Sequence, residues 1–337
     1  MDSWLLFKLT GVHATEPSNA SMTMLYNIKD NCWDSKMLEL FGIPENILPE
    51  IRPSIGDFGK VKPELFNVEI PVCSMLGDQQ AAMFGQNCTG PHEISINYGT
   101  GCFASVNTGK TRVKSETMFN SLVAWKMDKN RRFLLNGGVL FGGAAIQWLC
   151  DKLHIIDAPE DSEDLAKTAG SGGDILFIPA FFGLGAPYGD SDIRGTILGI
   201  DAGCTLAHLA RAALEGIAYR CAALFFAMEQ ETGNSYDCLK ASGSASENSF
   251  MMQFQADILG IPVIRSQITQ ASALGVALAA GKYCGVWENF DKIYDNLKAT
   301  TNFYPRISAK RRVALLERWR RAVEAAKLYK ASSVDKE

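Results

Sequence analysis

The stretch "GPHEISINYGTGCFASVNTG", residues 90–109, decides the fold predicted for this chain. Apolar side chains alternate with other residues along it, at Ile94, Ile96, Tyr98, Cys102, Ala104 and Val106. A period of two is typical of β-strands, and Gly99-Thr100-Gly101 lies at the break between the two alternating runs. The stretch is therefore predicted to form a β-hairpin with a tight glycine turn.

This turn is also the first candidate for a ligand site. Its two glycines lack a Cβ, so the backbone N–H groups can approach an anion closely, and Thr100 adds a hydroxyl. A plain tight turn is the alternative, because a single Gly-Thr-Gly motif is weak evidence.

The pattern on either side of the hairpin predicts a mixed α/β fold. Residues 121–138 predict a second hairpin that turns at 128–130, and residues 205–233 predict a long helix ended by Gly233. One apolar stripe follows that helix, at Leu206, Ala210, Ala213, Ile217, Cys221, Leu224 and Met228. Hairpins that alternate with helices, without regular βαβ units, favour a mixed sheet.

Composition narrows the class of protein. The 337 residues carry a net charge of −4 and a pI near 5.7, which gives no basic field for nucleic acid. The basic run at 309–330 has apolar residues at helical spacing (Val313, Leu316, Trp319 and Val323), so we interpret it as the solvated face of a packed helix. No apolar stretch reaches membrane-spanning length.

Cysteine and histidine usage points to a reducing compartment without a metal centre. The nine cysteines form no CxxC pair, and Cys73, Cys150 and Cys221 lie in apolar runs typical of buried residues. The four histidines are scattered, which makes a histidine–cysteine metal site improbable. A cytoplasmic location is expected.

An acid stands between two apolar blocks in "LGDQQAAMFG", residues 76–85. The preceding residues, 68–76, are predicted to form a buried strand that leads directly to Asp78. Asp78 has two interpretations. It either caps the following helix or presents its carboxylate to a cleft, where it takes a proton from a substrate.

Two further loops can hold phosphate or nucleotide. Gly142-Gly143 opens a helix that carries Gln147 one turn in, and a helix N-terminus attracts negative charge. Residues 243–248 form a Gly/Ser loop between a strand and a helix. Helix packing is the alternative for the first loop, and helix capping by Asn248 is the alternative for the second.

Taken together, these stretches resemble the FGGY family of carbohydrate kinases. The matching segments occur in family order and include "WLLFKLTG" (4–11), "SNASMTML" (18–25), "GDQQAAMFG" (77–85), "NYGTGCF" (97–103), "GAAIQWL" (143–149), "IPAFFGLGAPY" (178–188), "NSFMMQFQADILG" (248–260) and "ASALGVALAAG" (271–281). Residues 194–219 resemble the C-terminal signature of the family. The resemblance implies an actin/hexokinase-like (ribonuclease H-like) two-lobe α/β fold. Residues 1–87 would belong to the N-terminal lobe and 88–337 to the C-terminal lobe.

The resemblance also implies an activity and its residues. The chain would transfer phosphate from ATP to a small polyol, with Mg²⁺ as cofactor and glycerol as the expected substrate. Asp78 would be the general base and would hold Mg²⁺ weakly through water, while Gln79 and Phe103 would bind the polyol. The nucleotide would be held by Gly99, Thr100, Gly101, Gly143, Gln147, Gly243, Ser244 and Asn248.

The sequence departs from the family pattern in two places. The chain begins where family members are already well into their first lobe, so that lobe is expected to be incomplete. The segment before it would carry a phosphate-binding hairpin with an aspartate, and an arginine–glutamate pair for substrate hydroxyls. In addition, Ser242-Gly243-Ser244 stands where the family has Asp-Gly-Gly, which is expected to crowd the adenine side.

Three functions therefore stay open. The first is phosphorylation of glycerol, the second is phosphorylation of another polyol or ketose, and the third is a non-catalytic paralogue or remnant of the family. Retention of Asp78 and of the glycine turn favours an enzyme. Assembly into a homo-oligomer stays open too.

Overall fold

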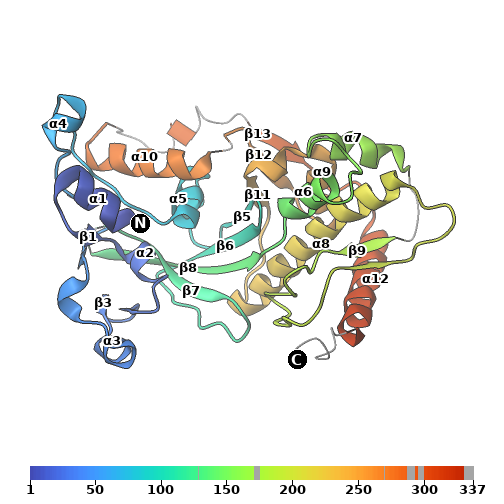
Figure 1. The fold of residues 1–337 in the computed structure, drawn as a ribbon, viewed down its shortest axis with the longest axis horizontal. Coiled ribbons are helices and arrows are strands. Elements are labelled where there is room, and N and C mark those ends of the chain that lie inside the picture. The colour runs from blue at the N-terminus through green and yellow to red at the C-terminus, as the bar shows by residue number, and fades with distance from the viewer. Residues whose placement is uncertain (128, 171–174, 269, 287–292, 295–299, 330–337) are drawn as a thin grey trace.

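The computed structural model describes residues 1–127, 129–170, 175–268, 270–286, 293–294 and 300–329. Its main element is a seven-stranded sheet with the order β13-β12-β11-β5-β6-β8-β7 (Figure 1). The strands are β5 (Ile94–Tyr98), β6 (Cys102–Gly109), β7 (Asn120–Met127), β8 (Asn130–Val139), β11 (Leu239–Ser242), β12 (Val263–Ser266) and β13 (Thr300–Phe303).

The strand directions make this a mixed sheet. β5 pairs antiparallel with β6, and β6 pairs antiparallel with β8. On its other side β5 pairs parallel with β11, and β11 pairs parallel with β12. Among the five inner strands, β8-β6-β5-β11-β12, only β6 therefore runs opposite to the rest. The residue pattern predicts such a mixed sheet, and the family resemblance implies this ribonuclease H-like arrangement of it.

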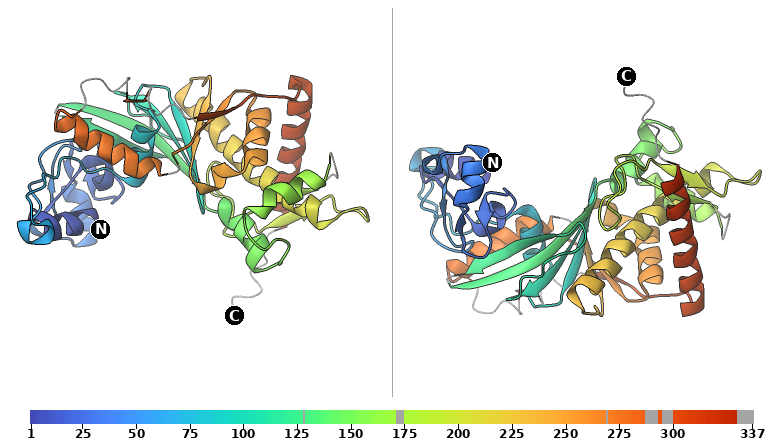
Figure 2. Two further views of the ribbon diagram at one scale, coloured as in Figure 1. Left: turned by 90° about the horizontal axis from the view of Figure 1, so that it is seen from above. Right: turned by 90° about the horizontal axis from the view of Figure 1, so that it is seen from below.

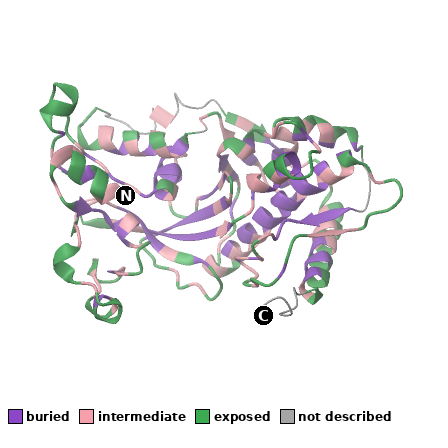
Figure 3. Ribbon diagram, in the orientation of Figure 1, coloured by how far each residue is buried: buried purple, intermediate pink, exposed green. Residues whose placement is uncertain are grey.

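Helices cover both faces of the sheet (Figure 2). One face packs against α6 (Gly143–Asp151), α8 (Leu206–Thr232) and α9 (Ser249–Leu259). Farther from the sheet, α7 (Asp161–Thr168) packs on α8 and α9, and α12 (Ala309–Leu328) packs on α9. The other face packs against α5 (Asp78–Gly85) and α10 (Ala271–Tyr283). Buried residues concentrate in the central strands and along α8 (Figure 3). Burial on both faces explains why Ser95 and Ser105 are as buried as their apolar neighbours.

The N-terminal residues form small elements beside the long β7–β8 hairpin. They are α1 (Asp2–Thr10), β1 (Ala14–Thr15), α2 (Pro17–Ala20), β2 (Tyr26–Asn27), β3 (Cys32–Trp33), α3 (Ser35–Phe41), a 3₁₀ turn (Glu45–Ile47), β4 (Glu50–Ile51) and α4 (Pro63–Phe66). β1 pairs with β4, and β2 pairs with β3. In the second half, β9 (Leu176–Ile178) pairs with β10 (Thr196–Leu198).

Most predicted elements are confirmed. The first hairpin pairs Tyr98 with Cys102 around the predicted turn, and β7 pairs with β8 as the second hairpin, although residue 128 of its turn lies outside the described residues. Gly233 ends the predicted long helix in the left-handed conformation, at a φ of 67°. Cys73, Cys150 and Cys221 are buried, as predicted.

Three predictions are wrong. They are the buried strand at residues 68–76 and the places of Leu206 and Val313 on the packed sides of their helices. Residues 68–76 form no regular strand, because they pair only with the neighbouring loop, for example through Phe58 N–H to the carbonyl of Val72, and leave Val68 exposed. Leu206 is 54% exposed, because it lies in the first turn of α8 before the helix reaches the core. Val313 is 63% exposed for the same reason in α12, where the buried stripe begins later, at Trp319.

Across the described residues, none of the helices has both the length and the apolar character that crossing a membrane demands.

Candidate active site

The first turn of α6 is built directly on the turn of the β5–β6 hairpin. Gly143 N–H donates to the carbonyl of Gly99 at 2.8 Å, and Ala144 N–H donates to the carbonyl of Thr100 at 3.1 Å. These two helix-start donors are therefore used inside the protein. By contrast, the N–H groups of Thr100 and Gly101 have no hydrogen-bond acceptor among the described residues. Two free backbone donors in a glycine turn make a site for an anion.

Glycine is required where these segments meet. A Cβ on Gly143 would lie 2.8 Å from the carbonyl oxygen of Gly99 and 3.3 Å from the Cβ of Ala245. A Cβ on Gly101 would lie 2.9 Å from the carbonyl oxygen of Val139. The helix, the turn and the 243–248 loop thus approach one another more closely than residues with side chains allow.

The 243–248 loop follows β11 and leads into α9. Gly243 has a φ of 90°, which favours glycine, and residues 244–247 form a 3₁₀ turn. Asn248 caps α9, because its side-chain oxygen accepts a hydrogen bond from Met251 N–H at 2.8 Å. Its Nδ2 donates to Ser162 Oγ at 3.2 Å. The capping interpretation is therefore correct, and Asn248 also faces the cavity described next.

A cavity of about 540 Å³ lies between these segments, within the size range of small-molecule sites. It is lined by Gly99, Thr100, Gly143, Ala144, Ile146, Gln147, Pro159, Glu160, Ser162, Glu163, Ser244, Ala245, Glu247 and Asn248. Six of the eight residues predicted to bind nucleotide are in this set, namely Gly99, Thr100, Gly143, Gln147, Ser244 and Asn248. Gly101 and Gly243 do not line the cavity but shape two of its loops.

Sequence reasoning missed the wall formed by residues 159–163. Glu163 is held in place by Ser249 N–H, which donates to it at 2.7 Å, and by Lys167 Nζ at 2.7 Å. Glu160 and Glu247 add two exposed carboxylates. No motif marks this segment, and its one signal is the acidic run at residues 160–164, which also suits an ordinary helix start.

Asp78 is the first residue of α5 and is exposed to solvent. The capping interpretation is wrong here, because the N-cap position is occupied by Gly77. One carboxylate oxygen of Asp78 accepts from Gln79 N–H at 2.8 Å and the other from Gln79 Nε2 at 3.3 Å. Ser272 Oγ, from α10, donates to the carbonyl of Asp78 at 2.8 Å. The carboxylate is thus positioned and remains accessible.

The segment before Asp78 is anchored by a buried carboxyl group. Gly77 N–H donates to Ser18 Oγ at 2.8 Å, and Ser18 Oγ donates to Glu16. Glu16 also accepts from Ser54 Oγ at 2.6 Å and from Asn19 N–H at 2.7 Å. Burial raises the pKa of Glu16, although these hydrogen bonds oppose the effect. The network fixes the backbone that leads into α5.

The two predicted polyol-binding residues lie apart from the large cavity. Gln79 follows Asp78 on the first turn of α5 and is half-buried. Phe103 lies on β6 just after the glycine turn, and its ring covers Gly138, where a Cβ would come within 2.7 Å of the ring. None of Asp78, Gln79 and Phe103 lines the 540 Å³ cavity.

Ser242 occupies the position where the family pattern has an acid. Its hydroxyl is buried and accepts a hydrogen bond from Gln86 Nε2 of the α5 C-cap at 2.9 Å. Ser244, the second departure, is exposed and lines the cavity. Its side chain therefore occupies space that glycine would leave open.

Within the described residues, no group of three or more His, Cys, Asp or Glu side chains is arranged to hold a metal ion. Mg²⁺ in phosphoryl-transfer sites usually keeps several waters and uses one or two carboxylates with the phosphates of the substrate. The exposed, positioned carboxylate of Asp78 fits that limited role.

The fold and the cavity define the class: an actin/hexokinase-like α/β protein with a nucleotide-sized site at its hairpin turn. Residues 1–85 match the N-terminal domain, and residues 94–283 the C-terminal domain, of the FGGY family of carbohydrate kinases. The chain belongs to that family.

Relatives share most of the chain. A glycerol kinase of Pseudothermotoga lettingae is 45% identical over 326 residues, covering 96% of this chain and 65% of that protein. A glycerol kinase of Deinococcus radiodurans is 44% identical over 329 residues, covering 97% and 66%. The structure of Plasmodium falciparum glycerol kinase with ADP has a TM-score of 0.89 and 31% identity, covering 96% of this chain and 65% of that one. This chain thus spans about 65% of the length of these relatives.

Proposed function

We propose that this chain takes part in the ATP-dependent phosphorylation of glycerol, which yields ADP and glycerol 3-phosphate. The observation that carries the proposal is the 540 Å³ cavity, where a glycine turn with free N–H donors meets the start of α6 and the 243–248 loop. The similarity to glycerol kinases, one of them solved with ADP, supports both the substrate and the nucleotide.

The cavity has two chemically different parts. Thr100 and Gly101 offer backbone N–H donors, which suit the terminal phosphates of ATP. Carboxylates of Glu160, Glu163 and Glu247 lie on other parts of the wall and repel phosphate. Carboxylates accept hydrogen bonds from hydroxyl and amino groups, so they suit the ribose and adenine. In this arrangement Gln147, Ser244 and Asn248 contact the nucleotide between the two ends.

Asp78 acts as the general base. A primary alcohol attacks phosphorus poorly until its proton is accepted, and an accessible carboxylate can accept it. As the proton moves to Asp78, the alcohol oxygen bonds to the γ-phosphorus and the bond to the leaving ADP oxygen breaks. Gln79 orients a polyol hydroxyl, and the ring of Phe103 covers its carbon atoms.

Mg²⁺ would be held by the ATP phosphates, with Asp78 contributing through water, and would neutralise charge on the phosphates. The remaining contribution of this chain is to hold the reacting groups in alignment. The Glu16 network holds the backbone before Asp78, and the bond from Ser272 holds its carbonyl. Alignment of the reacting groups is a large part of phosphoryl-transfer catalysis.

Three wider proposals go with this function. We assign residues 1–87 to an N-terminal lobe and 88–337 to a C-terminal lobe, since the seven-stranded sheet begins only after residue 88. A cytoplasmic location is supported by nine cysteines that are all free thiols. Self-association stays a prediction.

The experiment measures ADP binding by calorimetry and glycerol-dependent ADP formation on the 337-residue chain. Binding together with turnover supports the proposal, whereas binding without turnover on any polyol or ketose favours the non-catalytic alternative. Absence of nucleotide binding contradicts the cavity assignment. Gly143→Ala, which pushes against the hairpin turn, is expected to weaken ADP binding roughly tenfold or more. Gly203→Ala, in an exposed loop, serves as the control and leaves binding unchanged.

A further inference from the structure

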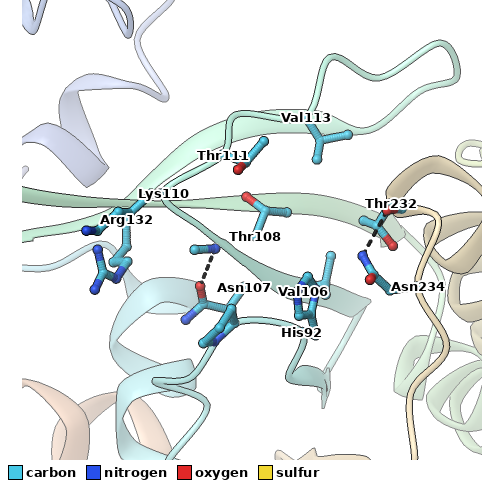
Figure 4. Close-up of a pocket in the computed structure, with 12 residues that line it drawn as sticks. His92, Val106, Asn107, Thr108, Lys110, Thr111, Val113, Arg132, Thr232 and Asn234 are labelled. Carbon is cyan, nitrogen blue, oxygen red and sulfur yellow. Dashed lines mark hydrogen bonds between the residues drawn. The ribbon is translucent and has the colours of Figure 1, made fainter.

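A second cavity, of about 420 Å³, lies at the opposite end of β6 from the glycine turn (Figure 4). It shares no lining residue with the nucleotide cavity. Its walls come from the residues before β5, the end of β6 and the loop that follows, strand β8, and the C-terminal end of α8 with the residue Asn234 beyond it. The lining residues are Pro91, His92, Val106, Asn107, Thr108, Gly109, Lys110, Thr111, Val113, Arg132, Thr232 and Asn234.

The charges on this cavity are all of one kind. Lys110 and Arg132 lie together at one end, and the imidazole of His92 lies farther along (Figure 4). None of the lining residues carries a carboxylate. Thr232, at the other end, is the last residue of α8, and a helix C-terminus carries partial negative charge. An anionic group is therefore favoured at the Lys110 and Arg132 end.

Two polar atoms at this site are buried without a hydrogen-bond partner among the described residues: Thr108 Oγ1 and Arg132 Nη1. Buried polar groups are nearly always paired, so each such atom calls for an explanation. The side chain of the neighbouring Asn107 is paired in both directions, since it accepts from Gly109 N–H at 2.8 Å and donates to the carbonyl of Cys88 at 3.2 Å. These two bonds anchor the loop, while the hydroxyl of Thr108, a residue only 8% exposed, has no partner among the described residues.

We propose that this cavity binds a small phosphomonoester that carries hydroxyl groups, such as a sugar phosphate. The phosphate accepts hydrogen bonds from Arg132 and Lys110, and charge-assisted pairs of this kind are the strong ones. The hydroxyl groups of the ligand bond to Thr108 and Thr111, whose side chains lie near each other in the middle of the cavity (Figure 4). This site is separate from the one proposed for ATP, so its test does not depend on turnover.

Calorimetric titration with glucose 6-phosphate and with inorganic phosphate, each with and without an excess of ADP, tests the proposal. Glucose 6-phosphate is expected to bind, and inorganic phosphate to bind more weakly. In Arg132→Gln the affinity should fall about tenfold or more, because a charged hydrogen bond is lost. Thr108→Val, which replaces the hydroxyl by a methyl group, should weaken the binding of glucose 6-phosphate more than that of inorganic phosphate.

Arg131→Gln is the matched control. Arg131 precedes Arg132 on β8 and loses the same charge, but its guanidinium donates to the carbonyl of Lys29 at 3.1 Å and lies over the ring of Phe133. The affinity of the Arg131→Gln chain for glucose 6-phosphate should equal that of the unmodified chain. Absence of binding, or an equal loss in both arginine variants, overturns the proposal. Equal affinity for the two probes overturns the assignment of a hydroxylated ligand.

An independent observation concerns two cysteines from distant parts of the chain. The sulfur atoms of Cys73 and Cys284 lie 3.2 Å apart. Cys284 is exposed at the end of α10, whereas Cys73 is buried in the segment that leads to Asp78. Burial, helped by the contact with Cys284, raises the pKa of Cys73 to about 11, so Cys284 is the thiol that meets an oxidant first.

We also infer that peroxide converts this pair into a reversible disulfide. Hydrogen peroxide oxidises the Cys284 thiol to a sulfenic acid and releases one water. The sulfur of Cys73 then displaces the hydroxyl group, its proton leaves with that group as a second water, and the S–S bond forms. The bond would tie the end of α10 to the segment before α5, where Ser74 Oγ already donates to the carbonyl of Val276 at 2.8 Å.

Mass spectrometry of peptides from the peroxide-treated chain tests this inference. A linked peptide pair containing Cys73 and Cys284, absent after treatment with dithiothreitol, is expected. The pair should disappear in Cys284→Ser and persist in Cys32→Ser, which removes another exposed cysteine. Accumulation of oxidised but unlinked Cys284, or linkage to other cysteines at the same level, contradicts it.

Discussion

Gly85 of α5 and Gly275 of α10 lie back to back where the two helices cross. A Cβ on Gly85 would lie 3.0 Å from the backbone nitrogen of Gly275, and a Cβ on Gly275 would lie 2.8 Å from the backbone nitrogen of Gly85. The helices therefore touch through their backbones. Because Asp78 begins α5 and its carbonyl is bonded to Ser272 of α10, this crossing positions the proposed base.

Gly275→Ala is expected to destabilise the chain by about 1–3 kcal/mol, because the added methyl group separates two helices in backbone contact. The better helix propensity of alanine offsets at most about 1 kcal/mol of this. Urea unfolding measures the change. Gly56→Ala is the control, since the nearest atom to its Cβ would be 3.6 Å away. A Gly275→Ala chain as stable as the unmodified one would show that the helices do not meet as described.

Asn248→Asp separates the two roles of this residue, which are to cap α9 and to line the nucleotide cavity. Aspartate caps helices as well as asparagine does but cannot donate the bond from Asn248 Nδ2 to Ser162 Oγ, so stability should fall by no more than about 1.5 kcal/mol. The new negative charge lies in the cavity with Glu163 and Glu247, and ADP affinity should fall roughly tenfold or more. Asp34→Asn, the opposite exchange at the cap of α3 and outside the cavity, should change neither quantity. Unchanged ADP binding in Asn248→Asp would remove this residue from the proposed site.

Glu16→Gln is expected to destabilise the folded chain by an amount that depends on pH. Both carboxylate oxygens of Glu16 accept hydrogen bonds, and the amide group of glutamine would face donors, at a cost of about 1–3 kcal/mol. The pKa of Glu16 is raised above 4.5 in the folded chain, so its proton is bound more tightly there than in the unfolded chain. That contribution to stability is complete below pH 4.5 and is lost as the pH rises through the raised pKa.

The unmodified chain should therefore exceed Glu16→Gln in stability by more at pH 5 than at pH 8, in denaturant titrations at both values. Glu64→Gln, at an exposed position, is the control and should show no such trend. A difference that grows towards pH 8 would mean that folding lowers the pKa of Glu16 instead of raising it.

The fold was predictable wherever local pattern and tertiary packing agree. Alternation predicts the β5–β6 hairpin, and the apolar stripe of 205–233 predicts the long helix α8 that packs on the sheet. The prediction of a strand at 68–76 was wrong. β-branched residues favour extended backbone, but they do not reveal whether the edge of a sheet is available for pairing. The prediction that Leu206 lies on the packed side of its helix was wrong, because helical periodicity does not show where along its length a helix meets the core.

The site was predictable only in part, because its residues come from segments that are distant in sequence. Glycine turns and helix starts carry local signals, so six of the fourteen residues that line the cavity could be named from the sequence. Residues 159–163 carry no such signal, and they reach the cavity only because α7 packs on α8 and α9. Glu16 looks like an ordinary surface acid in the sequence, and only the folded chain shows it buried and bonded to Ser18 and Ser54.

The most direct test of the central claim is the rate of glycerol-dependent ADP formation by Asp78→Asn at saturating ATP and glycerol, with Asp30→Asn as an exposed control. Loss of a positioned general base is expected to lower kcat by roughly 10²- to 10⁴-fold. ADP affinity should stay unchanged, because Asp78 lies outside the nucleotide cavity. A kcat in Asp78→Asn equal to that of Asp30→Asn would contradict the assignment of Asp78 as the base.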